Sequence, residues 1–454
     1  MTNHTTSSLP NAPLSHRVSR NLKVSSPLMK SIMKLVSNPY HPTKNPDGII
    51  NLGVAENRLL RSDMLRHVRS LVTVEEEHLS YGADPAGCGK LRQLIAAMVN
   101  RHFNPATPTN ADHVTVHNGT TSAIDAFMYT ICDPQEGVLI AAPYYGGFDF
   151  DCQMRADGQI VPVPMSVQQM FDADEHVRLL KEAYDQATTD GIIVRGIIFA
   201  NPHNPFGLCH SLSLIEKLLG FANTNNLHIL FDEIYALSTF TAELQALDNG
   251  TGPEELHPPR MDVDTPFRSV LSVENIAQFI DPSLVHVIHG MSKDFCMNGL
   301  RMGYLISPWN PEFIAAIRTV TMFSWFSGTT EQLLVNFFEN VEWVDSFLEE
   351  NRRALAKAYQ YVSQVLRRHG IDYIPSRAGH FMWVDLRPFC QLAPAEPRAT
   401  LASEQVTFEN LLDSGVYIAT GLAFHSTEPG WFRLSFAVPQ PELDLGLARF
   451  LKVI

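Results

Sequence analysis

The sequence lacks any apolar run that approaches the roughly 20 residues needed for a membrane-spanning helix. Its 34 basic residues against 48 acidic ones give a net charge of -14, which argues against a surface for nucleic acid or anionic membranes. No Cys-x-x-Cys pair occurs among the six scattered cysteines, so neither a zinc site nor a disulfide framework is indicated. The sequence therefore predicts a cytoplasmic protein with reduced thiols, no metal site, and neither nucleic acid nor membrane as a partner.

The remaining composition is that of a soluble globular protein. The chain has 454 residues, of which 45% are hydrophobic and 18% charged, and this length predicts one large and one smaller domain. Residues 1–17 are predicted to form a disordered tail, since their start is rich in Ser, Thr, Asn and Pro without the apolar core of a signal peptide. Residues 248–266 show no packing pattern and predict a surface excursion.

Short apolar runs alternate with helical patterns from residue 113 onward. Helices are predicted at 62–79, 89–103, 120–132, 177–187, 213–223 and across 312–369. Strands are predicted at 114–117, 138–142, 160–163, 194–200, 228–231, 284–289 and 302–306. Strands that are apolar throughout are buried on both faces, so the pattern predicts an α/β fold with a mostly parallel seven-stranded sheet between two helical layers. A smaller α+β unit follows, with strands at 381–386, 416–419 and 432–437 and helices at 408–414 and 441–451.

One lysine stands at the end of a predicted buried strand. The stretch His289-Gly290-Met291-Ser292-Lys293 follows the apolar run 284–288. A lysine in that position is poorly hydrated, and the loss of hydration lowers the pKa of its amine. A neutral amine is what Schiff-base chemistry requires. A Ser-Lys-Asp loop is more often a solvated turn, so the motif gains weight only from the residues that follow other strands.

Ligands bind at the carboxyl ends of the strands in open parallel sheets, which directs attention to the residues just after each strand. Gly119, Thr120 and Thr121 open a helix whose free amides could hold an anion such as phosphate, although a plain capped helix reads the same way. Tyr145 could stack on a flat ring. Asn204 lies in a turn that presents its amide at a fixed angle, or merely caps that turn.

Asp232 follows another apolar strand, and Tyr235 comes three residues later. An acid at a buried strand end requires a partner, and a protonated pyridine nitrogen would supply one. Together these side chains are the parts that hold a phosphorylated, pyridine-type aldehyde. No Gly-x-Gly-x-x-Gly after a strand, Walker loop, His-Glu-x-x-His or Gly-x-Ser-x-Gly competes with this set.

In this order the motifs resemble the fold type I pyridoxal-phosphate enzymes of the class I/II aminotransferase superfamily, from about Asn51 to the C-terminus. The resemblance implies that Lys293 forms a Schiff base with the cofactor and later moves the substrate's Cα proton. It also implies that Asp232 pairs with the pyridine nitrogen, that Tyr235 and Asn204 hydrogen-bond the ring's phenolic oxygen, and that Tyr145 stacks on the ring. The residues implied to hold the phosphate are Gly119, Thr120, Thr121, Ser292 and Arg301.

Further implied roles concern the substrate and the domains. Arg433, in Trp431-Phe432-Arg433-Leu434, matches the family arginine that grips the α-carboxylate, a bidentate task suited to guanidinium. Tyr81 matches the tyrosine that reaches the cofactor and substrate of the neighbouring subunit, so a homodimer with shared active sites is expected. The family arrangement places the large domain at 66–325 and builds the small domain from both chain ends, 18–65 and 326–454.

Within the superfamily the chain looks most like the 1-aminocyclopropane-1-carboxylate synthase-like branch. Ala55-Glu56-Asn57 resembles a synthase motif, and Glu56 is expected near the substrate, where its carboxylate could face the sulfonium of S-adenosylmethionine; the structural alternative is that Glu56 caps a turn. Tyr145-Gly146-Gly147-Phe148-Asp149 resembles Tyr-Pro-Gly-Phe-Asp of the synthases. Three departures concern Gly146, which replaces that proline, Gly290, which replaces a hydroxyl residue, and Arg58, where the synthases usually have glutamine.

The resemblance therefore implies a pyridoxal-phosphate enzyme that acts on an α-amino acid. The first expectation is Cα deprotonation with elimination or replacement of a γ group, on S-adenosylmethionine or a similar γ-substituted amino acid. The alternative is an aminotransferase that uses the same residues and a 2-oxo acid as second substrate. A binding or regulatory protein on this fold is a third class, and the intact Lys293, Asp232 and Arg433 argue for catalysis instead.

Overall fold

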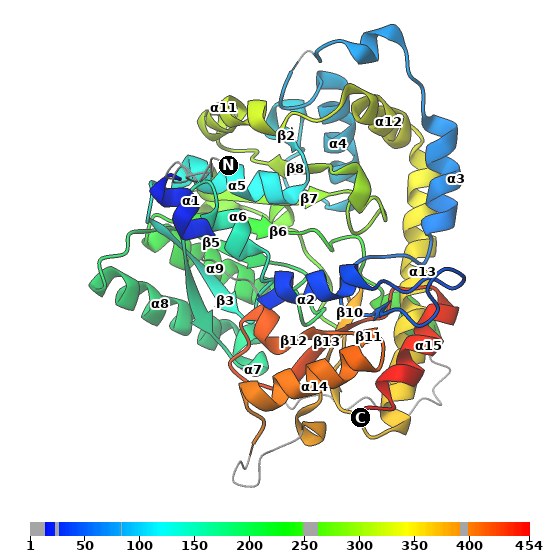
Figure 1. Ribbon diagram of the computed structural model, residues 1–454. Helices are drawn as coiled ribbons and strands as arrows, with labels where there is room; N and C mark the ends of the chain where they lie inside the picture. Colours follow the sequence, from blue (N-terminus) through cyan, green and yellow to red (C-terminus); the bar gives the residue numbers. More distant parts are fainter. Residues whose placement is uncertain (1–13, 23–26, 83, 248–261, 391–397) are drawn as a thin grey trace, which may run out of the picture.

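A seven-stranded sheet organises the larger part of the chain. The computed structural model describes residues 14–22, 27–82, 84–247, 262–390 and 398–454 (Figure 1). The strand order is β2-β8-β7-β6-β5-β3-β4, and β8 runs antiparallel to both of its neighbours. The strands are β2 (Val114–His117), β3 (Gly137–Ala142), β4 (Gln159–Pro164), β5 (Val194–Ala200), β6 (His228–Asp232), β7 (Val285–Gly290) and β8 (Gly303–Ile306). The predicted mostly parallel sheet is confirmed.

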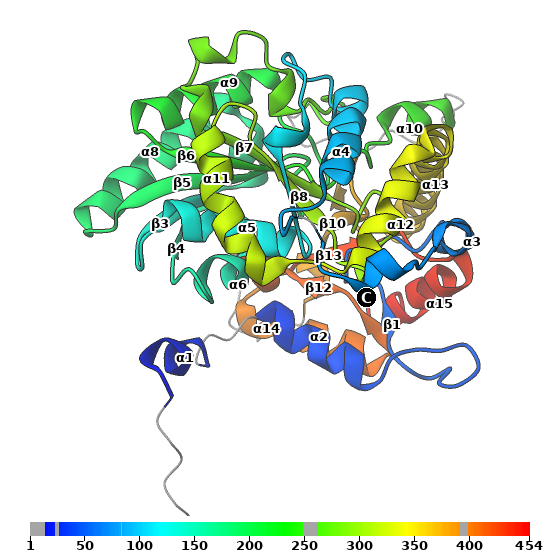
Figure 2. The same ribbon diagram turned by 90° about the horizontal axis from the view of Figure 1, so that it is seen from above.

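Both faces of this sheet are buried under helices. On β3, Leu139 belongs to a core cluster that includes Leu180, whereas Val138 and Ile140 pack in a separate cluster with Phe127. The alternation follows from the period of two along a strand, and it explains why these strands are apolar throughout. Helices α8 (Ala173–Thr189) and α9 (Leu212–Thr224) lie on one face; α5 (Thr120–Ile131), α6 (Phe148–Gln153) and α11 (Pro311–Val320) lie on the other (Figure 2).

A smaller α+β unit is built from the last part of the chain. Its four-stranded sheet has the order β12-β13-β10-β9. The elements are β9 (Tyr373–Ile374), β10 (Phe381–Asp385), β11 (Val416–Tyr417), β12 (Ala419–Thr420), β13 (Trp431–Ser435), α14 (Leu401–Asp413) and α15 (Gln440–Phe450). The early strand β1 (Ile50–Asn51) pairs in parallel with β11, so both chain ends meet here. The domain boundaries themselves stay a prediction.

The remaining helices connect or flank these two units. The longest of them, α13, runs along one side of the molecule toward α15 (Figure 1). No helix among the described residues is both long and apolar enough to cross a bilayer, and all six cysteines, each within the described ranges, are free. These helices are α1 (His16–Asn21), α2 (Pro27–Ser37), α3 (Arg61–Leu71), α4 (Gly89–His102), α7 (Val167–Phe171), α10 (Thr241–Leu247), α12 (Gly328–Glu339) and α13 (Val341–Arg368).

Several predicted elements are shorter or divided. The helix predicted at 62–79 ends at Leu71, where the β-branched run Val72-Thr73-Val74 disfavours helix, and a 3₁₀ turn follows at Glu76–Leu79. The single strand predicted at 416–419 is two strands, because β11 pairs with β1 whereas β12 pairs with β13. The helical region 312–369 is divided into α11, α12 and α13.

The two segments predicted to lack packing lie largely outside the described residues, at 1–13 and 248–261. Their described ends are ordered, which corrects the predicted boundaries. Residues 16 and 17 of the predicted tail already belong to α1. At the other segment, Val263 is buried and Asp264 accepts a hydrogen bond from Arg377 at 2.6 Å, so this end packs against the protein.

Candidate active site

A cavity of about 250 Å³ lies where β3, β5, β6 and β7 end at their carboxyl termini. Ten of the predicted residues line it: Thr120, Thr121, Tyr145, Asn204, Asp232, Tyr235, Ser292, Lys293, Arg301 and Arg433. A larger cavity of about 450 Å³, walled by Trp383 and Trp431, contains none of the predicted residues. These ten predicted residues therefore meet at the carboxyl edge of the sheet, as expected from the sequence.

The start of α5 forms an anion cradle. Gly119 precedes the helix with a φ of 83°, and among the described residues no side-chain capping bond is made at the start of α5. A Cβ atom at Gly119 would lie 2.4 Å from Nη2 of Arg301, so only glycine allows the guanidinium to approach the helix start this closely. Free amides, the positive end of the helix dipole and a guanidinium together attract an anion such as phosphate.

The Lys293 amine projects into the cavity from the loop after β7. Its Nζ donates a hydrogen bond to the backbone oxygen of Ala55 at 2.6 Å. Burial, and next the nearby Arg433 cation, lower the pKa of Lys293 to about 8. The next residue, Asp294, is fully buried and accepts hydrogen bonds from the Leu237 backbone and the Ser238 hydroxyl, which fixes the loop. About a tenth of this amine is therefore neutral at pH 7, far more than for an ordinary lysine, and the lowered pKa agrees with the expectation from the sequence.

Asp232 ends β6 with its carboxylate in the cavity. The side chain is 8% exposed, and its Oδ1 accepts a hydrogen bond from the Ile234 backbone at 3.2 Å. Burial raises the pKa of Asp232 to about 6, and within the described part of the chain no cation forms an ion pair with it. Tyr235 is buried nearby, its ring edge-on to His380 and Phe381. A carboxylate in this state is stabilised by a bound cationic group such as a pyridinium.

Arg433 lies at the centre of β13 and is 2% exposed. Its Nη1 donates to Oδ1 of Asn204 at 2.9 Å, and its Nη2 donates to the Gly53 oxygen at 2.7 Å. The guanidinium carbon lies 4.7 Å and 4.5 Å from the ring centres of Phe381 and Phe424. No carboxylate of the described residues pairs with it, and a buried cation without an anion is costly. The arrangement is suited to bind a carboxylate ligand.

Two predicted substrate residues do not line this cavity. Glu56 lies in a neighbouring pocket of about 320 Å³ together with Arg61 and Cys296. Its Oε1 accepts a hydrogen bond from Nδ2 of Asn298 at 2.6 Å and pairs with Nη2 of Arg61 at 2.7 Å. Asn298 lines both spaces, so Glu56 is one side chain away from the cavity. The predicted role of Glu56 stays a prediction, and the paired Arg61 is a partner that sequence reasoning missed.

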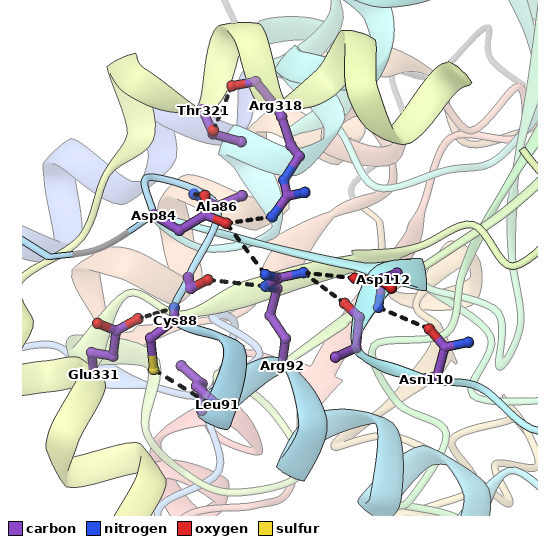
Figure 3. Close-up of polar contacts among 12 residues, drawn as sticks. Asp84, Ala86, Cys88, Leu91, Arg92, Asn110, Asp112, Arg318, Thr321 and Glu331 are labelled. Atoms are coloured by element: carbon purple, nitrogen blue, oxygen red, sulfur yellow. Dashed lines mark hydrogen bonds and ion pairs between the residues drawn. The ribbon is translucent and has the colours of Figure 1, made fainter. Parts of the chain in front are cut away.

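Tyr81 is the second of these residues, with 95% of its surface exposed. Its ring centre lies 6.0 Å from that of Trp325. Three residues after Tyr81, Asp84 accepts hydrogen bonds from both Arg92 and Arg318, as Figure 3 shows. Tyr81 itself does not line the cavity of its own chain, and the predicted crossing to a second subunit stays a prediction.

Asp151 is a cavity residue that the sequence reasoning missed. It lines the same space as Thr121 and Lys293, and its side chain is 7% exposed. The available signal was its spacing, because Phe148 and Asp151 are three residues apart and share one face of α6. An acid on the buried face of a short helix suggests a specific role.

Comparison with known proteins identifies the family. The model of the family "Aminotransferase class I and II" matches residues 47–450. The chain is 32% identical to 1-aminocyclopropane-1-carboxylate synthase-like protein 1 of Bos taurus, over 91% of this chain and 78% of that protein. It is 29% identical to 1-aminocyclopropane-1-carboxylate synthase 6 of Arabidopsis thaliana, over 88% and 77%. It is 30% identical to the probable aminotransferase sirI of Leptosphaeria maculans, over 92% and 94%.

Solved structures agree on the fold. Aspartate aminotransferase from Thermus thermophilus with maleate superposes with a TM-score of 0.71 at 20% identity, covering 98% of this chain and all of that one. Pyrococcus protein-A1 gives a TM-score of 0.73 at 18% identity, covering 96% and 97%. The fold type I architecture predicted from the sequence is confirmed.

The cavity fits the cofactor of this family. Pyridoxal phosphate combines a phosphate, a pyridine nitrogen and an aldehyde. The cavity offers an anion cradle at Thr120, Thr121 and Arg301, the carboxylate of Asp232 without a cationic partner among the described residues, and the desolvated amine of Lys293. The three groups line one space at the carboxyl edge of the sheet. The chain therefore belongs to the class I and II aminotransferase family and is a pyridoxal-phosphate-dependent enzyme related to the 1-aminocyclopropane-1-carboxylate synthases.

Proposed function

We propose that this enzyme is cytoplasmic, and that it removes the Cα proton of an α-amino acid that bears a leaving group on its γ carbon and eliminates or replaces that group. S-adenosylmethionine or a similar γ-substituted amino acid is the proposed substrate. One observation supports this most directly. A desolvated amine, Lys293, and a buried guanidinium, Arg433, line the same cavity, and no described carboxylate neutralises Arg433. An amino acid supplies both the proton and the carboxylate that these groups require.

Each residue has a proposed task toward the cofactor. Thr120, Thr121, Ser292 and Arg301 would hold its phosphate, together with the backbone at Gly119. Tyr145 would stack on the ring, Asp232 would keep the ring nitrogen protonated, and Tyr235 with Asn204 would bind the phenolic oxygen. When bound, the cofactor supplies an electron sink for the negative charge left at Cα.

The chain's own residues would then handle the substrate. Arg433 grips the α-carboxylate through its two terminal nitrogens, held in orientation by Asn204 and the Gly53 oxygen. This grip aims the Cα–H bond at Lys293, whose neutral amine accepts the proton. Phe381 and Phe424 keep water from the guanidinium and strengthen its attraction for the carboxylate.

An aminotransferase is the second candidate. The similarity to the probable aminotransferase sirI extends over 94% of that protein and favours it. Contact between Glu56 and Arg61 also favours it, because a carboxylate that is already paired attracts a sulfonium less strongly. The two candidates are distinguished by incubating the purified holoenzyme with S-adenosylmethionine and with uncharged amino acids. Continued release of the γ group without a 2-oxo acid substrate supports the first. One equivalent of keto acid and of pyridoxamine phosphate per active site, with continued turnover only after a 2-oxo acid is added, supports the second.

Freeing Glu56 from Arg61 is expected to strengthen the response to cationic substrates. In an Arg61→Ala variant, the affinity for S-adenosylmethionine should rise by roughly three- to tenfold, and in Glu56→Gln it should fall by a similar factor, because the pair is partly exposed and screened. Spectral titration of the holoenzyme measures both affinities. Arg66→Ala is the matched control, since Arg66 lies on the same helix and pairs with Asp63 on the surface. Unchanged affinities in both variants would favour the aminotransferase.

We further propose a homodimer whose active sites are shared. Tyr81, which is exposed and outside its own cavity, has exposed apolar neighbours: Leu79 is 79% exposed, Met322 57% and Phe323 75%. Trp325, whose ring centre lies 6.0 Å from that of Tyr81, is separated from Met322 and Phe323 only by Ser324. Burying such a patch against a second copy of the chain would remove apolar surface from water and would bring Tyr81 to another cavity.

Mixing two inactive variants tests the shared site. Tyr81→Ala and Lys293→Ala proteins are each expected to have little activity, and their equimolar mixture should recover about a quarter of the wild-type sites, because half of the dimers are hybrids with one intact site each. Activity before and after subunit exchange gives the measurement. If exchange is demonstrated but no activity returns, Tyr81 does not serve the neighbouring subunit.

A further inference from the structure

Asp151 places a second buried carboxylate beside the anion cradle. It projects from α6 into the cavity that Thr120, Thr121 and Arg301 also line, and only 7% of its surface is exposed. The side chain of Thr121 hydrogen-bonds to it. Within the described part of the chain no lysine or arginine forms an ion pair with Asp151. An anion site with a built-in carboxylate is unusual, because two negative charges repel strongly where little water screens them.

The charged groups around Asp151 are mostly negative. Asp232 approaches from β6 and Asp125 from α5, and Arg155 pairs with Asp125 at 3.4 Å. Arg301 is the nearby cation, and together with the Thr121 hydrogen bond it lowers the pKa of Asp151. These influences are outweighed by burial, followed by the charge of Asp232, which raise the pKa to about 7. The group therefore titrates near neutral pH before any anion enters.

We propose that Asp151 holds a proton whenever the cofactor phosphate occupies the cradle of Thr120, Thr121 and Arg301, so that cofactor binding takes up a proton. This inference rests on the proposed cofactor site and adds a residue to it. A protonated carboxyl removes the repulsion and supplies an O–H donor inside the anion site. An asparagine side chain at this position would also remove the repulsion and supply a hydrogen-bond donor, but independently of pH.

The sign of the pH dependence follows from linkage. Below about pH 7 Asp151 already carries its proton, and affinity for the phosphate does not depend on it. Above that pH the carboxyl is ionised in the free protein, so each binding event must take up a proton. The dissociation constant should then rise by up to about tenfold per pH unit until the pKa of the bound state is reached.

Pyridoxine 5′-phosphate is the suitable probe, because its alcohol cannot form a covalent bond with Lys293. Its dissociation constant is measured by fluorescence titration of the full-length chain freed of cofactor, from about pH 6 to about pH 9. Wild type and Asp151→Asn should bind equally at the low end, and the variant should bind roughly tenfold to a hundredfold more tightly at the high end. Titration of the phosphate and of Lys293 affects both proteins alike, so the difference reports Asp151. Asp149→Asn is the matched control, since Asp149 is bonded to Tyr144 and His425 and does not line the cavity.

Calorimetry of wild type and Asp151→Asn in buffers of different ionisation enthalpy gives a second readout. Wild type should take up close to one proton more per bound probe than the variant at about pH 8, and the difference removes protons exchanged by the phosphate, the ring nitrogen and Lys293. Parallel pH profiles for the two proteins, or equal proton uptake by both, would overturn the inference while leaving the cofactor site intact. Failure of wild type to bind the probe at any pH would instead overturn the proposed cofactor site, and this inference with it.

Discussion

A Lys293→Ala variant is expected to lose the covalently attached cofactor and nearly all turnover. The amine is the cavity group that can bond to the aldehyde, and burial lowers its pKa to about 8, which keeps part of it neutral. Its hydrogen bond to the Ala55 oxygen holds it in the cavity. Loss of proton transfer at Cα alone should lower kcat by roughly a hundredfold to ten-thousandfold. The yellow colour typical of the attached cofactor should also disappear or shift.

The position of the link is measured by reducing the wild-type holoenzyme with borohydride and mapping the labelled peptide. The label is expected on Lys293, and the extent of attachment should increase as pH rises through about 8, because only the neutral amine attacks the aldehyde. Lys217→Ala serves as the control, since Lys217 pairs with Asp174 on the surface. Label on any other lysine would contradict the central assignment.

The sheet was predictable because its strands are buried on both faces. Runs such as Val138 to Ala142 and Val194 to Ala200 contain too few polar residues to face water, and their alternation with helices leaves few other folds. Pairing between distant segments could not be predicted from such runs. Whether 416–419 forms one strand or two depends on β1, which comes far earlier in the chain. Local pattern specifies the element, whereas tertiary pairing decides its limits.

Some cavity residues could likewise be predicted from local pattern, whereas others depend on tertiary packing. Asp232 and Lys293 were predictable because Asp232 ends an apolar strand and Lys293 lies in the loop just after another, and the carboxyl ends of parallel strands meet. Asp151 was missed because the sequence alone predicts that an acid in a short helix faces solvent. Its burial is evident only once the helix is packed against α5. Arg61 was missed because its partner, Glu56, is identified only when the start of α3 packs beside Asn298. The sequence shows which residues carry charge, but which residues they pair with depends on packing.

Asp232→Asn is expected to reduce turnover far more than it weakens amino-acid binding. The carboxylate ends β6 in the cavity, is 8% exposed, and has its pKa raised to about 6 by burial. A protonated pyridine nitrogen would lower the pKa of the carboxylate again and would itself be kept protonated. That interaction strengthens as negative charge develops during Cα deprotonation, so its loss acts on the transition state. We expect kcat to fall by roughly a hundredfold to a thousandfold, with the dissociation constant of the amino acid changed by less than about tenfold.

The neighbouring acid provides a matched control for this prediction. Glu233 is fully buried and does not line the cavity; its Oε1 accepts a hydrogen bond from the Val270 backbone at 2.9 Å. Burial raises the pKa of Glu233 to about 8, so near pH 7 it is largely neutral and Glu233→Gln changes little charge. Steady-state kcat and spectral titration with amino acid are measured for both variants. A slow Asp232→Asn beside a nearly normal Glu233→Gln assigns the effect to the carboxylate in the cavity. Near-normal turnover in Asp232→Asn would show that another group serves the ring nitrogen, and equal losses in both variants would indicate damage to packing at the end of β6 instead.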